Sequence, residues 1–164
     1  MISQKARYAF KALLNLARAG ERVSRSARDI AAAERIPQAF LEQILLELRR
    51  AGLVGSRRGR DGGHVLLKNP DAISFGQVLR LIDGPVAPLP CLSRTAYRRC
   101  DDCSDEATCG LRRVFGRAYE ANLEVLEATT VADAIREGAG DLAPEADEAT
   151  ELPPPGRRIR AARA

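Results

Sequence analysis

The sequence is poor in aromatic residues and has no long hydrophobic segment. Among 164 residues it holds no tryptophan, one histidine and 4% aromatic residues, against 45% hydrophobic residues. This balance predicts an aliphatic and mainly helical core. No apolar run approaches the ~18–20 residues of a membrane span. The charged start MISQKARYAFKALLNLA merges into an amphipathic helix pattern and lacks the separate apolar region of a signal peptide. We therefore expect one compact domain with an extension, located in the cytoplasm and without a membrane partner.

The motifs of common enzymes are also lacking. No histidine lies near the cysteines, and the chain has no paired-carboxylate motif, no P-loop and no GxGxxG after a strand. No small-molecule substrate is evident. The chain is therefore predicted not to be an enzyme.

Positive charge is concentrated in the N-terminal part of the chain. Residues 1–70 hold 14 Lys and Arg against 6 Asp and Glu, and the remaining 94 residues hold 12 against 16. The formal net charge of +4 therefore combines +8 in the first part with −4 in the second. A basic N-terminal part favours a polyanionic partner such as nucleic acid. An ordinary solvated basic surface is the alternative.

One stretch, residues 36–70, is predicted to form a helix followed by a β-hairpin: IPQAFLEQILLELRRAGLVGSRRGRDGGHVLLKNP. Apolar residues recur at helical spacing from Phe40 to Leu48, and Gly52 after two arginines is a helix C-terminal signal. Short β-type runs flank an arginine- and glycine-rich turn. A helix followed by a basic hairpin is typical of a winged helix-turn-helix domain. The predicted fold class is thus mainly α with a small β-hairpin wing, plus a long C-terminal dimerisation helix.

Two helices are predicted before this stretch, and the second of them completes the helix-turn-helix. The first covers about residues 4–19 and is capped by Ser3. The second covers about residues 27–35 and is capped by Ser24 or Ser26. In such a unit, the leading residues of the following helix enter the major groove of DNA.

Double-stranded DNA is the predicted partner of this following helix and of the hairpin. Pro37 suits the first turn of the helix. The amide of Gln38 or Gln43 can address adenine in bidentate fashion. Glu42 can accept from the cytosine amino group, and Ala39 can touch a thymine methyl group. An exposed polar helix face is the alternative for these residues. The candidate DNA-contacting residues are Lys5, Arg28, Gln38, Ala39, Glu42, Gln43, Arg57, Arg58, Arg60 and His64.

The other candidates come from the wing and from the first helix. An arginine of the wing can enter a narrow minor groove or pair with phosphates, whereas a merely charged turn is the alternative. Lys5, Arg7 and Lys11 lie largely off the buried stripe of the first helix. We expect them to be free to approach phosphates, with solvated helix charges as the alternative. His64 is expected to pack or to contact a phosphate rather than to bind a metal.

All four cysteines lie within residues 91–109, in the segment CLSRTAYRRCDDCSDEATC. Their spacing is C-x8-C-x2-C-x5-C, on a loop that ends at a helix start. A C-x2-C pair is a common chelating unit, and soft thiolate ligands select zinc or an iron–sulfur cluster. Arginines at positions 94, 98 and 99 offset the thiolate charge. A metal or cluster site is therefore predicted, with free thiols or a redox disulfide as the alternatives. The candidate metal ligands are Cys91, Cys100, Cys103 and Cys109.

Four segments are predicted along the chain. Residues 1–84 form the DNA-binding domain and residues 85–110 a proline-rich connector with the cysteine loop. Residues 111–137 hold the dimerisation helix, and residues 138–164 form a disordered tail. The long helix carries an apolar stripe. Pairing with a second copy of the chain would bury this stripe and match two-fold operators, whereas folding back onto its own domain is the alternative.

Together these motifs resemble the Rrf2 family of bacterial transcriptional regulators, whose members include iron–sulfur cluster, nitric-oxide and cysteine-metabolism sensors. The resemblance runs from Ile2 to about Ala134, some four fifths of the chain. It is carried by YAFKALLNLA, IPQAFLEQIL, LRRAGLVGSRRGRDGGHVLLKNP and the cysteine segment. It implies a homodimeric winged-helix repressor or activator with the long helix as dimer interface. It also implies that Glu42 helps to read bases and that Arg58 enters the minor groove.

The cysteine segment departs from the commonest sensor pattern of that family. Those members have three cysteines and a non-cysteine ligand, whereas this chain has four cysteines, and only the Cys103–Cys109 interval matches. His64 stands where the family usually places Tyr after a GG pair. Four thiolates can ligate a 2Fe–2S or 4Fe–4S cluster without outside help, and zinc is the alternative. A thiol–disulfide switch and a protein-interaction module without DNA are further alternatives.

The resemblance and the cysteine loop together lead to one hypothesis for regulation. Cluster loss or oxidation frees the loop between the connector and the long helix. The two recognition helices of a dimer then shift relative to each other. Half-sites lie about one helical turn apart, roughly 34 Å, so a small shift weakens binding.

Overall fold

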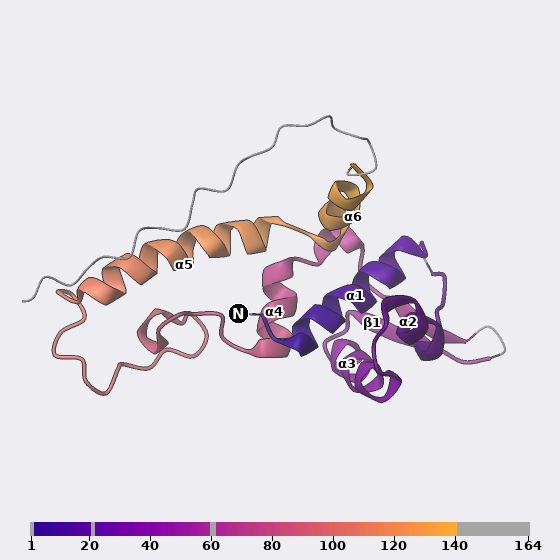
Figure 1. Cartoon of the computed structure of the whole chain (residues 1–164), viewed down its shortest axis with the longest axis horizontal. Helices are drawn as coiled ribbons and strands as arrows, with labels where there is room; N and C mark the ends of the chain where they lie inside the picture. Colours follow the sequence, from indigo (N-terminus) through magenta and orange to yellow (C-terminus); the bar gives the residue numbers. More distant parts are fainter. Residues whose placement is uncertain (1, 21, 60–61, 141–164) are drawn as a thin grey trace, which may run out of the picture.

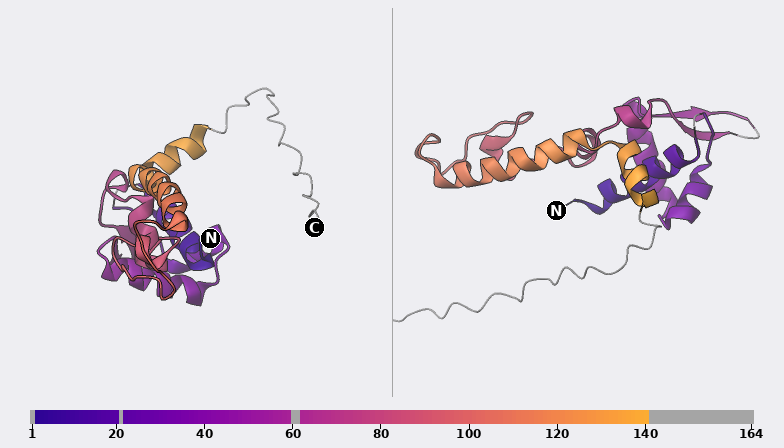
Figure 2. Two further views of the ribbon diagram at one scale, coloured as in Figure 1. Left: turned by 90° about the vertical axis from the view of Figure 1, so that its left-hand side faces the viewer. Right: turned by 90° about the horizontal axis from the view of Figure 1, so that it is seen from above.

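The structure, a computed structural model, describes residues 2–20, 22–59 and 62–140. Helices α1 to α4, the hairpin and α6 lie together, while α5 extends away from them (Figures 1 and 2). The loop after α4 runs outward to the far end of α5, and this helix then runs back towards α6 (Figure 1). The elements are α1 Gln4–Arg18, α2 Ala27–Glu34, α3 Gln38–Arg50, β1 Val54–Arg57, β2 Gly63–Leu66, the 3-10 turn η1 Pro70–Ala72, α4 Phe75–Asp83, the 3-10 turn η2 Pro90–Leu92, α5 Gly110–Ala128 and α6 Val131–Gly140.

Helices α1 and α2 begin at serine caps, and α3 ends at a glycine. The Ser3 hydroxyl accepts from a backbone N–H in the first turn of α1 at 3.0 Å. Ser26 does the same for α2 at 3.1 Å, so both predicted caps are confirmed and Ser26 is the serine used. Pro37 lies one residue before α3, not inside its first turn. Gly52 ends α3 with a φ of +70°, a conformation in which glycine avoids the steric cost of a Cβ.

An aliphatic core joins α1, α3, α4 and α6. Leu13 and Leu16 of α1 and Ile44 and Leu48 of α3 belong to one buried cluster, and all four side chains are 1% exposed or less. Burying one such side chain contributes about 1.5–3 kcal/mol. The core also includes Ala6, Ala9, Phe10, Ala12, Ile30, Ala31, Ile36, Leu41, Leu45, Leu53, Val54, Ile73, Val78, Leu79 and Val131. Because the core takes one side of α3, the opposite side of this helix remains at the surface.

The hairpin of β1 and β2 is antiparallel, with Ser56 opposite His64. Arg25, just before α2, forms an isolated antiparallel bridge to it through two backbone hydrogen bonds with His64, of 2.9 and 2.7 Å. Gly63 permits this approach, because a Cβ at this position would lie 2.5 Å from the Arg25 carbonyl oxygen. The hairpin is thereby attached directly to the helix-turn-helix.

Helix α5 is covered by its own chain on one side only. Tyr119 and Leu123 are its buried residues. At its C-terminal end, Glu127 pairs with Arg80 of α4 and accepts from the Ser74 hydroxyl at 3.4 Å. The apolar stripe predicted for dimerisation is largely exposed, so the alternative in which it folds back onto its own domain is not what the structure shows for these residues.

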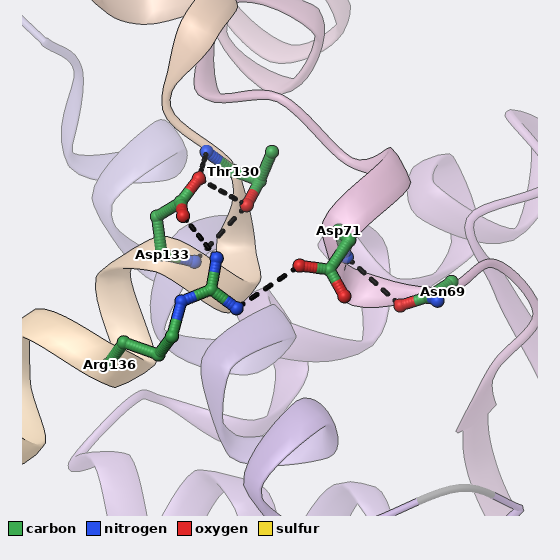
Figure 3. Close-up of polar contacts among 5 residues, drawn as sticks. All are labelled: Asn69, Asp71, Thr130, Asp133 and Arg136. Atoms are coloured by element: carbon green, nitrogen blue, oxygen red, sulfur yellow. Dashed lines mark hydrogen bonds and ion pairs between the residues drawn. The ribbon is translucent and has the colours of Figure 1, made fainter.

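Helix α6 is fastened to η1 by a polar cluster (Figure 3). The Thr130 backbone N–H and hydroxyl donate to the Asp133 carboxylate at 2.8 and 2.6 Å. Arg136 pairs with Asp133 and, at 3.2 Å, with Asp71. The Asp71 N–H donates to Asn69 at 3.0 Å. Hydrogen bonds from Thr130, then from Arg136, lower the pKa of Asp133 to about 2.

The C-terminal part of the chain is only partly described. Helix α6 runs to Gly140, three residues into the segment predicted as a tail, and residues 141–164 lie outside the described part. Among the residues that the structure describes, no helix is both long and apolar enough to cross a bilayer.

Candidate functional site

The four side chains predicted to read bases lie on the outer face of the N-terminal half of α3. Gln38, Ala39, Glu42 and Gln43 are all exposed. Leu41, between them in sequence, is fully buried. The Gln38 amide donates to the Glu42 carboxylate at 2.9 Å. The structure therefore brings these four positions together on one polar face.

The turn before α3 is tight, which fixes the angle between α2 and α3. Arg35 closes α2 in the left-handed conformation, with φ +54° and ψ +51°. The following Ile36 N–H donates to the Ala31 carbonyl at 3.0 Å, and the Ile36 side chain is 4% exposed. A buried anchor inside the turn holds the two helices in one relative orientation.

The wing presents arginines at the end of β1. Arg57 and Arg58 are exposed. The Arg57 guanidinium donates to the Arg22 carbonyl at 3.4 Å, whereas the Arg58 side chain has no polar contact within the described residues. Arg60, the third predicted arginine, lies outside the described residues. In the described part of the wing, Arg57 is thus held near the loop before α2, whereas Arg58 is available to a partner.

His64 lies at the base of the wing and faces α3. Burial, and then the nearby Arg49 charge, lowers the pKa of His64, with Glu42 acting in the opposite direction. Its Nδ1 atom is buried without a hydrogen-bond partner among the described residues. The lowered pKa favours the neutral form of this imidazole.

The cations of α1 are less available than expected. Lys5 forms an ion pair with Glu47 of α3 at 2.8 Å, and Lys11 donates to the Glu34 carbonyl at the end of α2 at 2.9 Å. Both lysines are thus engaged within the chain, because these acceptors come within reach when the helices pack, and the contact of Lys5 with DNA stays a prediction. Arg28, in the first turn of α2, is exposed.

All four cysteines line one cavity of about 270 Å³ at the N-terminus of α5. All four are free thiols. Cys109 caps α5, because its sulfur accepts from the Arg112 backbone N–H at 3.4 Å. Burial, followed by the neighbouring Cys91 thiol, raises the pKa of Cys100. The loop therefore brings residues from both ends of an 18-residue interval to one place.

The donor set of this cavity fits a thiolate-ligated metal group. Soft sulfur ligands suit zinc or an iron–sulfur cluster. As the chain stands, no three Cys, His, Asp or Glu side chains among the described residues are close enough together to hold a metal ion. A cluster of several irons separates its thiolate ligands more widely than one ion does. The cavity thus gathers four soft sulfur donors, although they are not close enough together, in the described residues, to hold a single ion.

Arginines contact the cysteine loop, but not all those that the sequence suggested. Arg99 donates to the carbonyls of Cys103 and Ser104, each at 2.9 Å. Arg94 instead pairs with Glu120 of α5. Arg112, which was not among the candidates, reaches the Cys91 carbonyl at 2.5 Å. Its only signal in the sequence is its place three residues after Cys109.

The exposed side of α5 borders a second, larger cavity. Phe115, Ala118 and Leu126 line it together with the connector after α4, and its volume is about 600 Å³. Leu111 and Val125 lie on the same helix and are 65% and 63% exposed. The described residues of its own chain cover this apolar side only in part.

Comparison with known proteins agrees with this arrangement. The Rrf2 family profile, described as an iron-dependent transcriptional regulator, matches residues 2–137. A protein of Rhodobacter capsulatus named as an rrf2-like HTH-type transcriptional regulator is 50% identical, over 84% of this chain and 94% of its own. The structure of CymR, the global cysteine regulator of B. subtilis, superposes with a TM-score of 0.70 at 34% identity, over 84% of this chain and 97% of its own. IscR of T. potens superposes with a TM-score of 0.69 at 25% identity, over 88% and 93%. The chain belongs to the Rrf2 family of winged-helix transcriptional regulators.

Proposed function

We propose that the protein is a homodimeric, sequence-specific DNA-binding repressor or activator that senses redox or iron–sulfur status through its four cysteines. The observation that carries the DNA-binding part is the exposed polar face of α3 beside the arginine-bearing hairpin. Direct attachment of the hairpin to the segment before α2 holds both in one orientation. The family membership supports the same function.

In this proposal the two surfaces contact adjacent grooves of one duplex. Gln38, Ala39, Glu42 and Gln43 enter the major groove, where amide and carboxylate groups distinguish bases. The Gln38–Glu42 hydrogen bond is exchanged for bonds to base edges. Arg58 enters the minor groove, whose negative potential attracts a guanidinium. Lys5, Arg28, Arg57, Arg60 and His64 are assigned to the phosphate backbone or to the support of these contacts.

The second copy is held through α5. This helix exposes Leu111, Val114 and Phe115 on its N-terminal half, and an apolar side left in water favours association. A two-fold dimer places two recognition helices on half-sites about one helical turn, roughly 34 Å, apart. DNA affinity then depends on the relative placement of the two α5 helices.

The cysteine loop lies at the start of this same helix. Cys91, Cys100, Cys103 and Cys109 would hold an iron–sulfur cluster, which supplies redox- and oxygen-sensitive chemistry when bound. Cys109 caps α5, so a change in the loop acts on the first turn of that helix. Similarity to IscR and the description of the family as iron-dependent support a metal-linked signal, whereas similarity to CymR leaves a cluster-free thiol regulator as the alternative.

Anaerobic purification followed by iron, sulfide and zinc analysis tests the cysteine site. A brown protein with stoichiometric iron and sulfide is expected, and its colour should fade in air. Replacement of all four cysteines by serine should abolish the bound metal. Stoichiometric zinc without visible absorbance would replace the cluster by a structural zinc site. Absence of both would leave a thiol–disulfide switch.

A salt titration of DNA binding tests the interface. The probe is a duplex selected from a random library with the wild-type protein. Arg58→Ala should weaken binding and lower the slope of log affinity against log salt by about one, because one phosphate-region cation is lost. Arg113→Ala serves as the control. It removes an equal charge from the first turn of α5, away from the helix-turn-helix and the wing. No binding, or binding that does not depend on salt, would favour a protein-interaction module.

A further inference from the structure

Arg112 reaches both ends of the cysteine segment from the first turn of α5. Its backbone N–H donates to the Cys109 sulfur at 3.4 Å. Its guanidinium Nη1 donates to the Cys91 carbonyl oxygen at 2.5 Å, across 21 positions of sequence. One residue thus contacts the first and the last of the four cysteines.

The same guanidinium also holds the middle of the loop. Its Nη1 lies 3.2 Å from the Glu106 carboxylate. The other oxygen of that carboxylate accepts from the Tyr97 hydroxyl at 2.5 Å. Tyr97 lies between Cys91 and Cys100, and Glu106 lies between Cys103 and Cys109, so every interval except the short C-x2-C turn is tied to Arg112.

This contact differs from an ordinary surface ion pair, which contributes little. The Arg112 and Glu106 side chains are 33% and 25% exposed, and Cys91 is 4% exposed. A carbonyl on a buried residue that loses its donor is costly to leave without a partner.

The neighbouring arginine offers a matched comparison. Arg113 follows directly in the same turn of α5 and carries the same charge. Its side chain is exposed and makes no polar contact within the described residues. Any effect that depends only on positive charge at the start of α5 should therefore appear equally at both positions.

We propose that Arg112 is a positioning residue of the four-cysteine site: it holds Cys91 and the Cys100–Cys109 segment against α5 before a metal binds. This inference rests on the proposed metal or cluster site. It adds that the four-cysteine site is partly assembled before metal binds, and that the Arg112 guanidinium joins the cysteine loop to α5. Outer-shell partners of metal ligands typically change metal affinity by about 10- to 100-fold when they are replaced.

The test compares the full-length wild-type chain with Arg112→Gln, Arg112→Lys and Arg113→Gln. Zinc affinity is measured by competition with a chromophoric chelator, and cobalt(II) is added separately to record its thiolate absorption bands. Thermal unfolding without metal checks that each variant is folded. Arg112→Gln should bind zinc about 10- to 100-fold more weakly and shift the cobalt bands, because the ligand geometry changes.

The lysine variant and the control make the outcome specific. Arg112→Lys keeps the charge but not the fork of donors, so its zinc affinity should fall between wild type and Arg112→Gln. It also carries the test if Arg112→Gln does not fold. Arg113→Gln should match wild type in affinity and spectrum. Equal zinc affinity and equal cobalt spectra for wild type and Arg112→Gln would overturn this inference while leaving the cysteine site in place. A wild-type protein that binds neither zinc nor cobalt, and that holds no iron and sulfide after anaerobic purification, would instead overturn the site itself.

Discussion

The exposed side of α5 allows a quantitative prediction for the dimer. Phe115 is the largest side chain on that side and is 43% exposed in the single chain. If α5 pairs with its copy, the exposed part of this ring is removed from water. Phe115→Ala should therefore weaken the dimer without unfolding the protomer, because the ring contributes little to the core of its own chain.

The size of the effect follows from the exposed area. A phenylalanine side chain presents roughly 200 Å², so an exposed fraction of 43% corresponds to about 90 Å². At about 25 cal/mol per Å² this is ~2 kcal/mol per subunit and ~4 kcal/mol for the two rings of a two-fold dimer. The alanine keeps its Cβ, which reduces the loss to about 3–4 kcal/mol. Since about 1.4 kcal/mol is tenfold in affinity, the dimer dissociation constant should rise about 10²- to 10³-fold.

Sedimentation equilibrium over a range of protein concentrations measures this constant. The loss of translational and rotational freedom is common to both proteins, so it cancels in the comparison. Leu46→Ala on α3, at a residue that is 37% exposed, is the control and should leave the constant unchanged. If Phe115→Ala dimerises as tightly as wild type, the exposed stripe of α5 is not the dimer interface.

Two further predictions concern the stability of the protomer. In Gly63→Ala, the new Cβ would lie 2.5 Å from the Arg25 carbonyl oxygen. Neither backbone can move freely, so unfolding should require about 1–3 kcal/mol less. Gly110→Ala, with nothing within 4 Å of its Cβ, should change stability by less than about 0.5 kcal/mol; equal melting temperatures for the two variants would contradict the close approach. The pKa of Asp133 is lowered from 3.8 to about 2, so its contribution is present above pH 3.8 and is lost as the pH falls towards 2. The difference in unfolding free energy between wild type and Asp133→Asn, measured with urea from pH 6 to pH 2, should shrink over that window. A difference that does not vary with pH would refute this assignment.

The local features of the fold could be predicted from sequence because their causes are local. A serine before an apolar-periodic segment satisfies N–H groups of the first helical turn, and Ser3 and Ser26 do so here. Gly52 ends α3 through its own backbone preference. The hairpin follows from two β-type runs around a glycine-rich turn. Each signal involves residues a few positions apart, so the chain alone is sufficient to predict it.

Contacts between distant residues were predicted poorly. Lys5 and Lys11 looked free in a helical projection, but α3 and the end of α2 supply Glu47 and the Glu34 carbonyl. Arg25 gave no sign that it would pair with His64. The sequence did not indicate that Arg112 of α5 would contact the Cys91 carbonyl. In each case the partner lies tens of residues away or is set by the angle between helices, which local periodicity does not contain.

By itself, the sequence determined the approximate positions of the helices, the wing, the place of four cysteines on one loop and the family to which the chain belongs. Those properties depend on hydrophobic periodicity, turn residues and motif spacing, all of which can be read from residues close together in the sequence. Only the tertiary structure decided that α3 keeps one polar face exposed, that the apolar side of α5 remains uncovered, and that Cys91 and Cys109 meet at Arg112. Their physical reason is packing in three dimensions, which determines the faces that the core buries and the donors that reach a given carbonyl.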